Sequence, residues 1–497
     1  MSLLALPHPW ADAVILGVLS LYGFITGFKR SPAVLTVLVL AVTLSAFWIP
    51  AGTKLGGATI VPVAVFAGVA LRRLAQPGSN SALRIPKGLL LVLLALGGYA
   101  MIAVWLAPPR PPGAPAGLQA PSVRPIVQAA SYALVLLFFL IPTLVRIELS
   151  DLRDLAVKVQ AFIAADAAYG IYQLLAHRLG LPFRGIEYFT GAGGRQGVGV
   201  MSAAGAQLWR MSGLSNEPKQ LAALTLVGLV MALMSRGLYE SDAKRYLVLG
   251  LCATGFVGAW STGGMLAALV LLATGLAWTL GSPAHAVRRV TIIAVAAVAV
   301  ALVGAAALGG FSHGVSVFKE VAFGRVSIPG LHQAQGASPR IENAVVRYFE
   351  DHPLTLITGL GLGQYPYIVG PPGRWSWAGG IQPMHSLPLT LLADFGVVSL
   401  VLLGAALLRG FRTLGVRGLG VLNTARQALT DPIRRTIVGG LTAAAVVSIF
   451  LNTLPLVLVF LGAAASWKRL GRSMGNESGP AWWSGGTSPA QPAYSQL

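Results

Sequence analysis

Long apolar runs, separated by short polar segments, recur along the whole chain. Most runs are about 15 to 22 residues long, and about 20 helical residues are needed to cross a hydrocarbon core of roughly 30 Å. The pattern therefore predicts a series of helices that cross a membrane. About thirteen such helices are expected, at residues 11–27, 32–49, 57–71, 88–106, 126–145, 155–175, 221–234, 246–260, 265–280, 290–308, 386–408, 437–451 and 454–467.

The composition supports this interpretation. Of the 497 residues, 55% are hydrophobic and 10% are charged, whereas soluble globular domains carry about 25% charged residues. The expected fold class is an all-α polytopic integral membrane protein with about 12 to 13 transmembrane helices and two long outer (periplasmic) loops. We expect residues 1–472 to form a single transmembrane domain, and the Gly-, Ser- and Pro-rich segment 473–497 to be a disordered cytoplasmic tail.

Basic residues are concentrated in the short polar segments rather than in one patch. The formal net charge of +20 therefore predicts an oriented membrane protein and disfavours nucleic-acid binding. The basic segments alternate along the chain, and basic residues in short loops stay on the cytoplasmic side. This places the N-terminus outside, the C-terminus inside, and the long hydrophilic loops 177–220 and 309–385 on the outer face. The basic groups include Lys29 and Arg30, Arg72 and Arg73, Arg146 and Arg153, Arg236 with Lys244 and Arg245, Arg288 and Arg289, and Lys468 to Arg472.

The first outer loop is rich in cations. Its only acidic residues are Glu187 and Glu217, and an apolar run follows Pro218. Guanidinium groups match phosphate oxygens bidentately, so a lipid-linked phosphate or diphosphate is the expected ligand. The alternative is that these side chains contact lipid headgroups only. The candidate ligands among these cations are Arg184, Arg195, Arg210 and Lys219.

The second outer loop combines an amphipathic piece with a glycine-rich piece. Residues 340–350 carry apolar side chains near helical spacing, so we expect a helix lying along the membrane interface, with Arg340 and Arg347 at headgroup depth. His352 follows it. The loop closes on His385, whose ordinary pKa of about 6.5 suits a base or a phosphate-binding donor. Asp394, farther along, is expected either to take part in chemistry or to fix helix packing.

Nothing in the sequence points to a cofactor. The His, Asp and Glu residues lack metal-ligand spacing, and Cys252 is the single cysteine. A phosphate-cradling P-loop is also missing, so ATP is not the expected energy source. We expect metal-independent chemistry.

An ordered set of short motifs over roughly residues 200 to 400 resembles the bacterial O-antigen ligase and polymerase superfamily. The motifs, in family order, are Arg210-x-x-Gly213, Glu217-Pro218, Ser261-Thr-Gly-Gly264, Arg340, His352-Pro353 with Gly359, Gly361 and Gly363, His385-Ser386, and Asp394 with Gly396.

The motifs depart from the family pattern in four places. Thr262 stands where the family often has a phosphate-binding arginine, so Lys219 or Arg195 would substitute. Asp394 replaces a glutamate, and Ser386 replaces an asparagine. Glu217 before Pro218 resembles polymerases more than ligases, which commonly have Asn-Pro.

The resemblance implies a multi-pass protein of the bacterial inner membrane, acting at its outer face on undecaprenyl-diphosphate-linked glycans. Arg210 and Arg340 would hold the diphosphate, assisted by Lys219 and Arg195. His385 or Glu217 would take a proton from the acceptor sugar hydroxyl. We prefer His385 as the base and Glu217 as an orienting group, because a carboxylate beside cations is a weak base. Supporting roles fall to Asp394, His352 and Arg347.

The function predicted first is polymerisation of lipid-linked repeat units for a surface polysaccharide, such as O-antigen, capsule or exopolysaccharide. One alternative is an O-antigen ligase that transfers glycan to lipid A core or to protein. An alternative of another class is a transporter of lipid-linked sugar, whose intramembrane ionisable candidates would be Asp166 and Asp394. The expected partners are the lipid-linked donor and acceptor and the bilayer, with a chain-length regulator and a flippase as candidate partner proteins.

Overall fold

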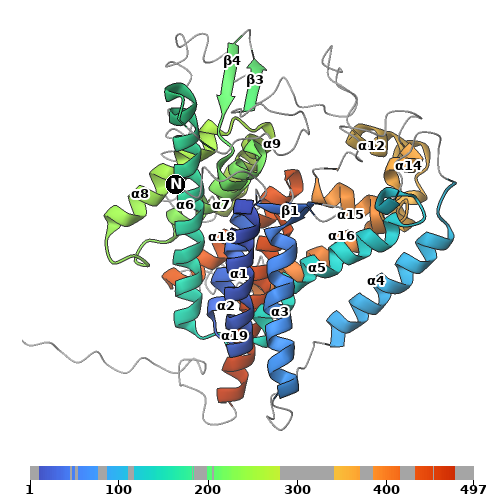
Figure 1. The fold of residues 1–497 in the computed structure, drawn as a ribbon, viewed down its shortest axis with the longest axis horizontal. Coiled ribbons are helices and arrows are strands. Elements are labelled where there is room, and N and C mark those ends of the chain that lie inside the picture. The colour runs from blue at the N-terminus through green and yellow to red at the C-terminus, as the bar shows by residue number, and fades with distance from the viewer. Residues whose placement is uncertain are drawn as a thin grey trace, which may run out of the picture.

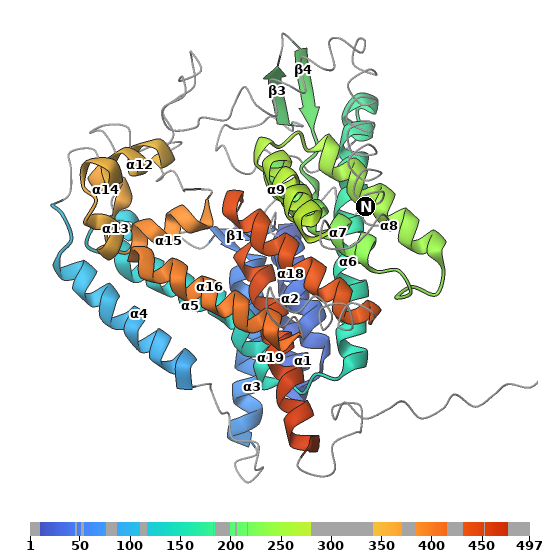
Figure 2. The same ribbon diagram turned by 180° about the vertical axis from the view of Figure 1, so that it is seen from behind.

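The computed structural model describes residues 10–44, 47–50, 54–75, 87–109, 117–181, 183, 199–203, 206–215, 217–279, 341–369, 384, 386–414, 431–451 and 453–475. Over these residues the chain is a bundle of helices (Figures 1 and 2). The helices are α1 (Trp10–Lys29), α2 (Ala33–Thr43), α3 (Gly57–Ala75), α4 (Lys87–Trp105), α5 (Arg124–Leu144), α6 (Leu149–Leu179), α7 (Pro218–Met234), α8 (Asp242–Gly258), α9 (Thr262–Thr279), α12 (Ile341–Asp351), α13 (Thr355–Thr358), α14 (Tyr365–Val369), α15 (Leu387–Phe395), α16 (Val397–Thr413), α18 (Pro432–Phe450) and α19 (Leu454–Gly475).

The predicted all-α membrane fold is confirmed. Within the described ranges, four helices are long and apolar enough to cross a membrane: Asp12–Lys29, Gly57–Ala75, Arg124–Leu144 and Pro432–Phe450. Five shorter apolar helices accompany them: Ala33–Thr43, Leu89–Trp105, Pro218–Met234, Thr262–Ala273 and Leu454–Trp467. The strands form two short antiparallel ribbons, β1 (Trp48–Pro50) with β2 (Lys54–Gly56) and β3 (Gly199–Ala203) with β4 (Ala206–Arg210).

Close helix packing depends on small residues. α1 and α3 run side by side, and a Cβ on Gly27 would overlap the carbonyl oxygen of Val65, while one on Gly68 would overlap that of Phe24. α18 and α19 form the hairpin that the sequence predicts around residues 452–455. Ser448 and Thr453 bridge it through their hydroxyl oxygens at 2.7 Å.

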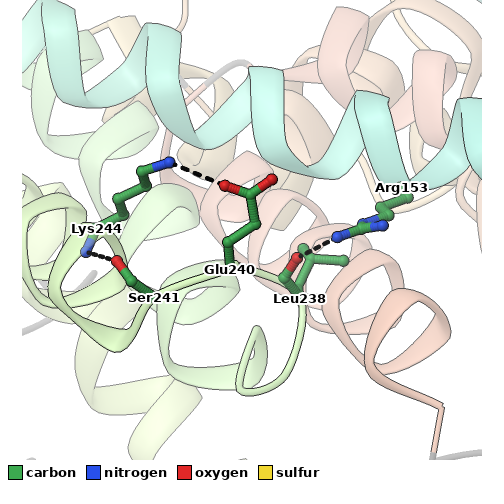
Figure 3. A network of polar contacts seen from close by, with 5 residues as sticks. All are labelled: Arg153, Leu238, Glu240, Ser241 and Lys244. Atoms are coloured by element: carbon green, nitrogen blue, oxygen red, sulfur yellow. Dashed lines mark hydrogen bonds and ion pairs between the residues drawn. The ribbon is translucent and has the colours of Figure 1, made fainter.

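Basic loops meet at one end of the helices. The Arg30 side chain is close enough to Arg72 and Arg73 for their charges, together with its burial, to lower its pKa; burial is the larger cause. At a second basic group, Arg153 of α6 donates to the Leu238 carbonyl at 3.2 Å, and Lys244 bonds Glu240 at 3.2 Å (Figure 3).

A further arginine secures this second group. Arg435 of α18 donates to the carbonyls of Met234 and Arg236 at 2.7 and 2.6 Å. The C-terminal end of α7 is thus capped by a cation, as the helix dipole favours.

The described parts of the two long loops lie at the opposite ends of these helices. α6 begins at the second basic group, yet its middle contacts Gly213. α18 also begins there, and its last residues contact Gly263 of α9. The N-terminal turn of α5 contacts Gly363. Which side of the membrane each group of loops faces stays a prediction.

Several predicted boundaries are wrong. The span expected at 386–408 is two helices, α15 and α16, because Gly396 between them adopts φ 71°. α2 ends at Thr43, where a turn leads into β1, so the span expected at 32–49 is shorter. α6 continues well beyond 155–175 at both ends, and α19 runs to Gly475, past the expected end of its span at 467. The span expected at 290–308 lies outside the described residues.

The amphipathic helix expected at 340–350 is present as α12, but its apolar face does not lie on the membrane. Val345 and Phe349 are buried against Leu360, Tyr365 and Met384. The apolar side chains are therefore used to pack the second loop against itself.

Candidate functional site

The segment that follows β4 forms a turn held by a buried glutamine of α6. The Gln173 Oε1 atom accepts from the backbone N–H groups of Ser212 at 3.2 Å and Gly213 at 2.9 Å, and Nε2 donates to the Gly213 carbonyl at 3.1 Å. One amide side chain thus satisfies both polar backbone groups of Gly213. Because Gln173 is 2% exposed, losing these bonds would leave buried polar groups unpaired.

Asp166, about two turns earlier on α6, holds the next residues of the same turn. Its Oδ1 atom accepts from the Leu214 backbone N–H. Gly213 adopts φ 62°, and a Cβ there would overlap Asp166 Oδ1. The glycine of the Arg210-x-x-Gly213 motif is therefore required both for its backbone angle and for this close approach.

Arg210 ends β4 and is tied to the end of α8. Its Nε atom donates to the Ala259 carbonyl at 2.9 Å, and the Met211 N–H donates to the Gly258 carbonyl at 2.9 Å. Ser261 follows directly, and its hydroxyl accepts from the Gly264 N–H at 3.3 Å at the start of α9. Two motifs about 50 residues apart in the sequence are thus joined in space, and we call residues 210–218 with 258–264 the first motif group.

The Glu217-Pro218 motif starts α7. Glu217 is the N-cap residue and Pro218 occupies the first turn, where the missing N–H has no intrahelical partner to lose. Lys219 Nζ lies 2.7 Å from Glu217 Oε2, and both side chains are about 30% exposed. Within this pair Lys219 compensates the charge of Glu217, which makes it a weaker replacement for an absent phosphate-binding arginine.

Asp394 joins three separate parts of the chain. Its carboxylate accepts from the Tyr132 hydroxyl at 2.6 Å, from Gln128 Nε2 at 3.3 Å and from the Gly363 N–H at 2.8 Å. Its carbonyl accepts from the Tyr99 hydroxyl at 3.0 Å. Asp394 is fully buried, and its hydrogen bonds hold α4, α5 and the glycine-rich piece together. A part in the chemistry stays a prediction.

Two glycines let α15 meet the glycine-rich piece. A Cβ on Gly359 would lie 2.7 Å from the Gly396 nitrogen, and the Leu360 N–H donates to the Ala393 carbonyl at 2.6 Å. Ser386 caps α15 by accepting from the Leu389 N–H. The Ser386 that replaces the family's asparagine is thus still a good N-cap. We call residues 359–365 with 384–396 the second motif group.

His352 and Arg347 lie on the exposed side of α12. The His352 ring stacks on Tyr348 with centroids 4.3 Å apart, and its Nδ1 atom lies 3.2 Å from the Tyr348 carbonyl oxygen. The structure does not bring either residue to Asp394 or to Arg210 through a contact within the described ranges. Their supporting role stays a prediction.

Met384 packs on Tyr365 and precedes His385. Burial, followed by the charge of Asp394, raises the pKa of Tyr365 to about 12, so this hydroxyl stays protonated at neutral pH. His385, Arg340 and Arg195 lie outside the described residues.

Two polar stripes on apolar helices were not predicted, although the sequence contains a signal for both. Asp166 and Gln173 fall at i and i+7 on α6, with the small Gly170 between them. Arg124, Gln128 and Tyr132 of α5 recur at every fourth residue. Such spacing places polar groups on one helix face, toward the bundle and away from lipid.

Replacing Gln173 with leucine is expected to disturb the Arg210 turn. The variant leaves two backbone N–H groups without an acceptor, at a cost of about 1 to 3 kcal/mol for each. We expect a strong loss of activity, measured as surface-glycan chain length at matched protein levels. Gln160→Leu is the matched control, because Gln160 is also buried on α6 but, among the described residues, its amide bonds the Ala156 carbonyl of its own helix alone. Equal effects of the two variants would contradict the assignment.

The fold and the two motif groups define a class, namely a helical membrane protein with polar side chains gathered at one end of its bundle. The family model described as O-Antigen ligase matches residues 247–404. This match confirms the resemblance to the O-antigen ligase and polymerase superfamily, and it indicates an enzyme of glycan processing in a bacterial membrane. The matched stretch holds the 261–264 break and the second motif group, whereas Arg210 and Glu217 precede it. No curated protein matches the chain.

Proposed function

We propose that this protein polymerises undecaprenyl-diphosphate-linked oligosaccharide repeat units at the outer face of the bacterial inner membrane. The observation that carries the proposal is the first motif group. A guanidinium is oriented by the Ala259 carbonyl, on a turn that Gln173 and Asp166 hold, at the helix ends opposite the basic loops. A preoriented guanidinium at that depth suits the diphosphate of a lipid-linked glycan.

In the proposed reaction, a hydroxyl oxygen of the acceptor sugar attacks the anomeric carbon of the donor. The bond from that carbon to the diphosphate oxygen breaks, and undecaprenyl diphosphate leaves with the electron pair. His385 takes the hydroxyl proton, Glu217 orients the acceptor, and Arg210 with Arg340 stabilises the charge that develops on the diphosphate. The products are a glycan longer by one transferred chain and free undecaprenyl diphosphate.

The ligase alternative uses the same chemistry with lipid A core or protein as the acceptor. Glu217 before Pro218 favours the polymerase. The transporter alternative is less well supported, because it needs carboxylates free to bind protons or ions. Asp394 is instead engaged at both carboxylate oxygens, by Tyr132 and by the Gly363 N–H. Asp166 Oδ1 accepts from the Leu214 N–H, whereas its Oδ2 atom is buried without a hydrogen-bond partner among the described residues.

Deletion of the gene, followed by electrophoresis of surface glycans, tests the proposal. Loss of a polymerase leaves single repeat units attached to the cell surface. Loss of a ligase leaves long chains on the carrier lipid, and loss of a transporter leaves repeat units on the cytoplasmic side. We expect the first pattern, restored by the intact gene and not by His385→Ala. Long unattached chains would favour the ligase.

A further inference from the structure

A cation that belongs to neither long loop lies beside the second motif group. Arg124 is the first residue of α5. A Cβ on Gly363 would lie 2.9 Å from Arg124 Cγ and 3.4 Å from Nε, so the arginine occupies the space that the absent glycine side chain leaves. This packing holds the base of the guanidinium in place.

The Nε donor of Arg124 has no acceptor among the residues that the structure describes. Its Nε atom is buried without a hydrogen-bond partner, while the residue as a whole is only half-buried. Asp394 lies within electrostatic range of Arg124, but no ion pair joins the two in the described part of the chain. The carboxylate is occupied by Tyr132, Gln128 and Gly363.

Arg124 also acts on a residue that contacts Met384, the neighbour in sequence of the expected catalytic base. Its charge acts on Tyr365, and Tyr365 accepts a hydrogen bond from the backbone N–H of Met384, the residue before His385. An arginine kept on the non-cytoplasmic side runs against the usual distribution of basic residues in membrane proteins. A guanidinium that is held in place by packing, and whose charge no described carboxylate pairs, is preorganised for an external anion.

We propose that Arg124 binds a phosphate group of a membrane lipid at the second motif group, and that this lipid is the undecaprenyl diphosphate carrier. The proposal rests on the proposed function. It adds a cation that the sequence motifs did not identify, in a chain where Thr262 replaces an expected arginine. Arg124 presents two or more N–H groups to the phosphate oxygens, while Gly363 keeps the side chain in position.

Lipid binding to the purified full-length protein in nanodiscs tests whether Arg124 binds the carrier phosphate. The probes are undecaprenyl diphosphate without glycan and, separately, phosphatidylglycerol. We expect Arg124→Gln to weaken binding of undecaprenyl diphosphate about tenfold or more and to leave phosphatidylglycerol binding unchanged. Arg124→Lys keeps the charge but loses the planar set of N–H donors that binds a phosphate through two hydrogen bonds. An intermediate loss of affinity is therefore expected. Arg146→Gln removes an exposed arginine at the basic end and should match wild type.

Each outcome decides a different question. Wild-type affinity in both Arg124 variants would overturn the inference while leaving the proposed function intact. An equal loss for both lipids would overturn it in favour of a general headgroup contact. If the wild-type protein itself fails to bind undecaprenyl diphosphate, the proposed function falls as well. If the melting temperature shows that Arg124→Gln does not fold, the affinities of the Arg124→Lys variant for the two lipids decide between the same outcomes.

Discussion

Replacing Arg210 with alanine is expected to abolish chain extension, so that surface glycans shrink to single repeat units. Each charge-assisted hydrogen bond to a diphosphate oxygen contributes about 1.5 to 3 kcal/mol, and about 1.4 kcal/mol corresponds to a tenfold change in rate. Removing a bidentate interaction from the transition state therefore lowers the rate by at least about a hundredfold. Arg210→Lys keeps the charge without the bidentate guanidinium geometry, so an intermediate chain length is expected.

The measurement is the length distribution of surface glycans at equal protein levels in the membrane. Arg146→Ala is the control for removal of one positive charge, because Arg146 is exposed and its ion pair is with an equally exposed Glu148. Wild-type chain lengths in cells that carry Arg210→Ala would remove Arg210 from the site. A melting temperature equal to that of the wild-type protein distinguishes weaker diphosphate binding from unfolding.

Replacing Gly396 with alanine is expected to destabilise the protein more than any other single methyl group added in the second motif group. The residue adopts φ 71° with ψ −168°, a backbone region essentially confined to glycine that costs other residues about 1 to 3 kcal/mol. The new Cβ would also overlap the Ile357 carbonyl oxygen. Overpacking against backbone adds about 1 to 3 kcal/mol. The junction of α15 and α16 would have to open, and Asp394 would move with it.

The expected result is a lower melting temperature of the purified protein together with a loss of activity. Gly404→Ala in α16 is the matched control, since nothing lies within 4 Å of a Cβ built there. Alanine in a helix interior is slightly better tolerated than glycine, so this control should be neutral or mildly stabilising. If the two variants have the same melting temperature, the close approach at Gly396 is not important for stability.

The positions of the membrane helices could be predicted well because lipid selects for length and apolarity at once. The break at Gly396 could not. Val397 and Val398 continue the apolar run, so hydropathy carries no sign of a backbone angle that depends on contact with Ile357. α6 was predicted too short because its outer turns pack on β4, where His177 and Arg178 contact Trp209, so they need not be apolar.

The candidate site also contains residues that the sequence predicted and residues that it did not. Motif order identified both Arg210 and the Ser261 break, but not that the two meet. The structure joins them through the Ala259 carbonyl. Gln173 was not predicted, although its spacing from Asp166 was visible, because a buried glutamine has no chemistry that marks it as important. Its role arises only when a distant segment brings unpaired N–H groups to it. Glycine positions such as Gly213 depend on the same long-range contacts.

The place where α6 meets the Arg210 turn has a kinetic consequence. Asp166 is 17 residues beyond Leu149, or about 25 Å along the helix at 1.5 Å per residue, which is close to the roughly 30 Å thickness of a bilayer interior. A carrier held there keeps its isoprenoid tail dissolved among the acyl chains while its glycan stands in water. Turnover should then saturate with the mole fraction of carrier in the leaflet, and remain insensitive to the total volume in which the vesicles are suspended.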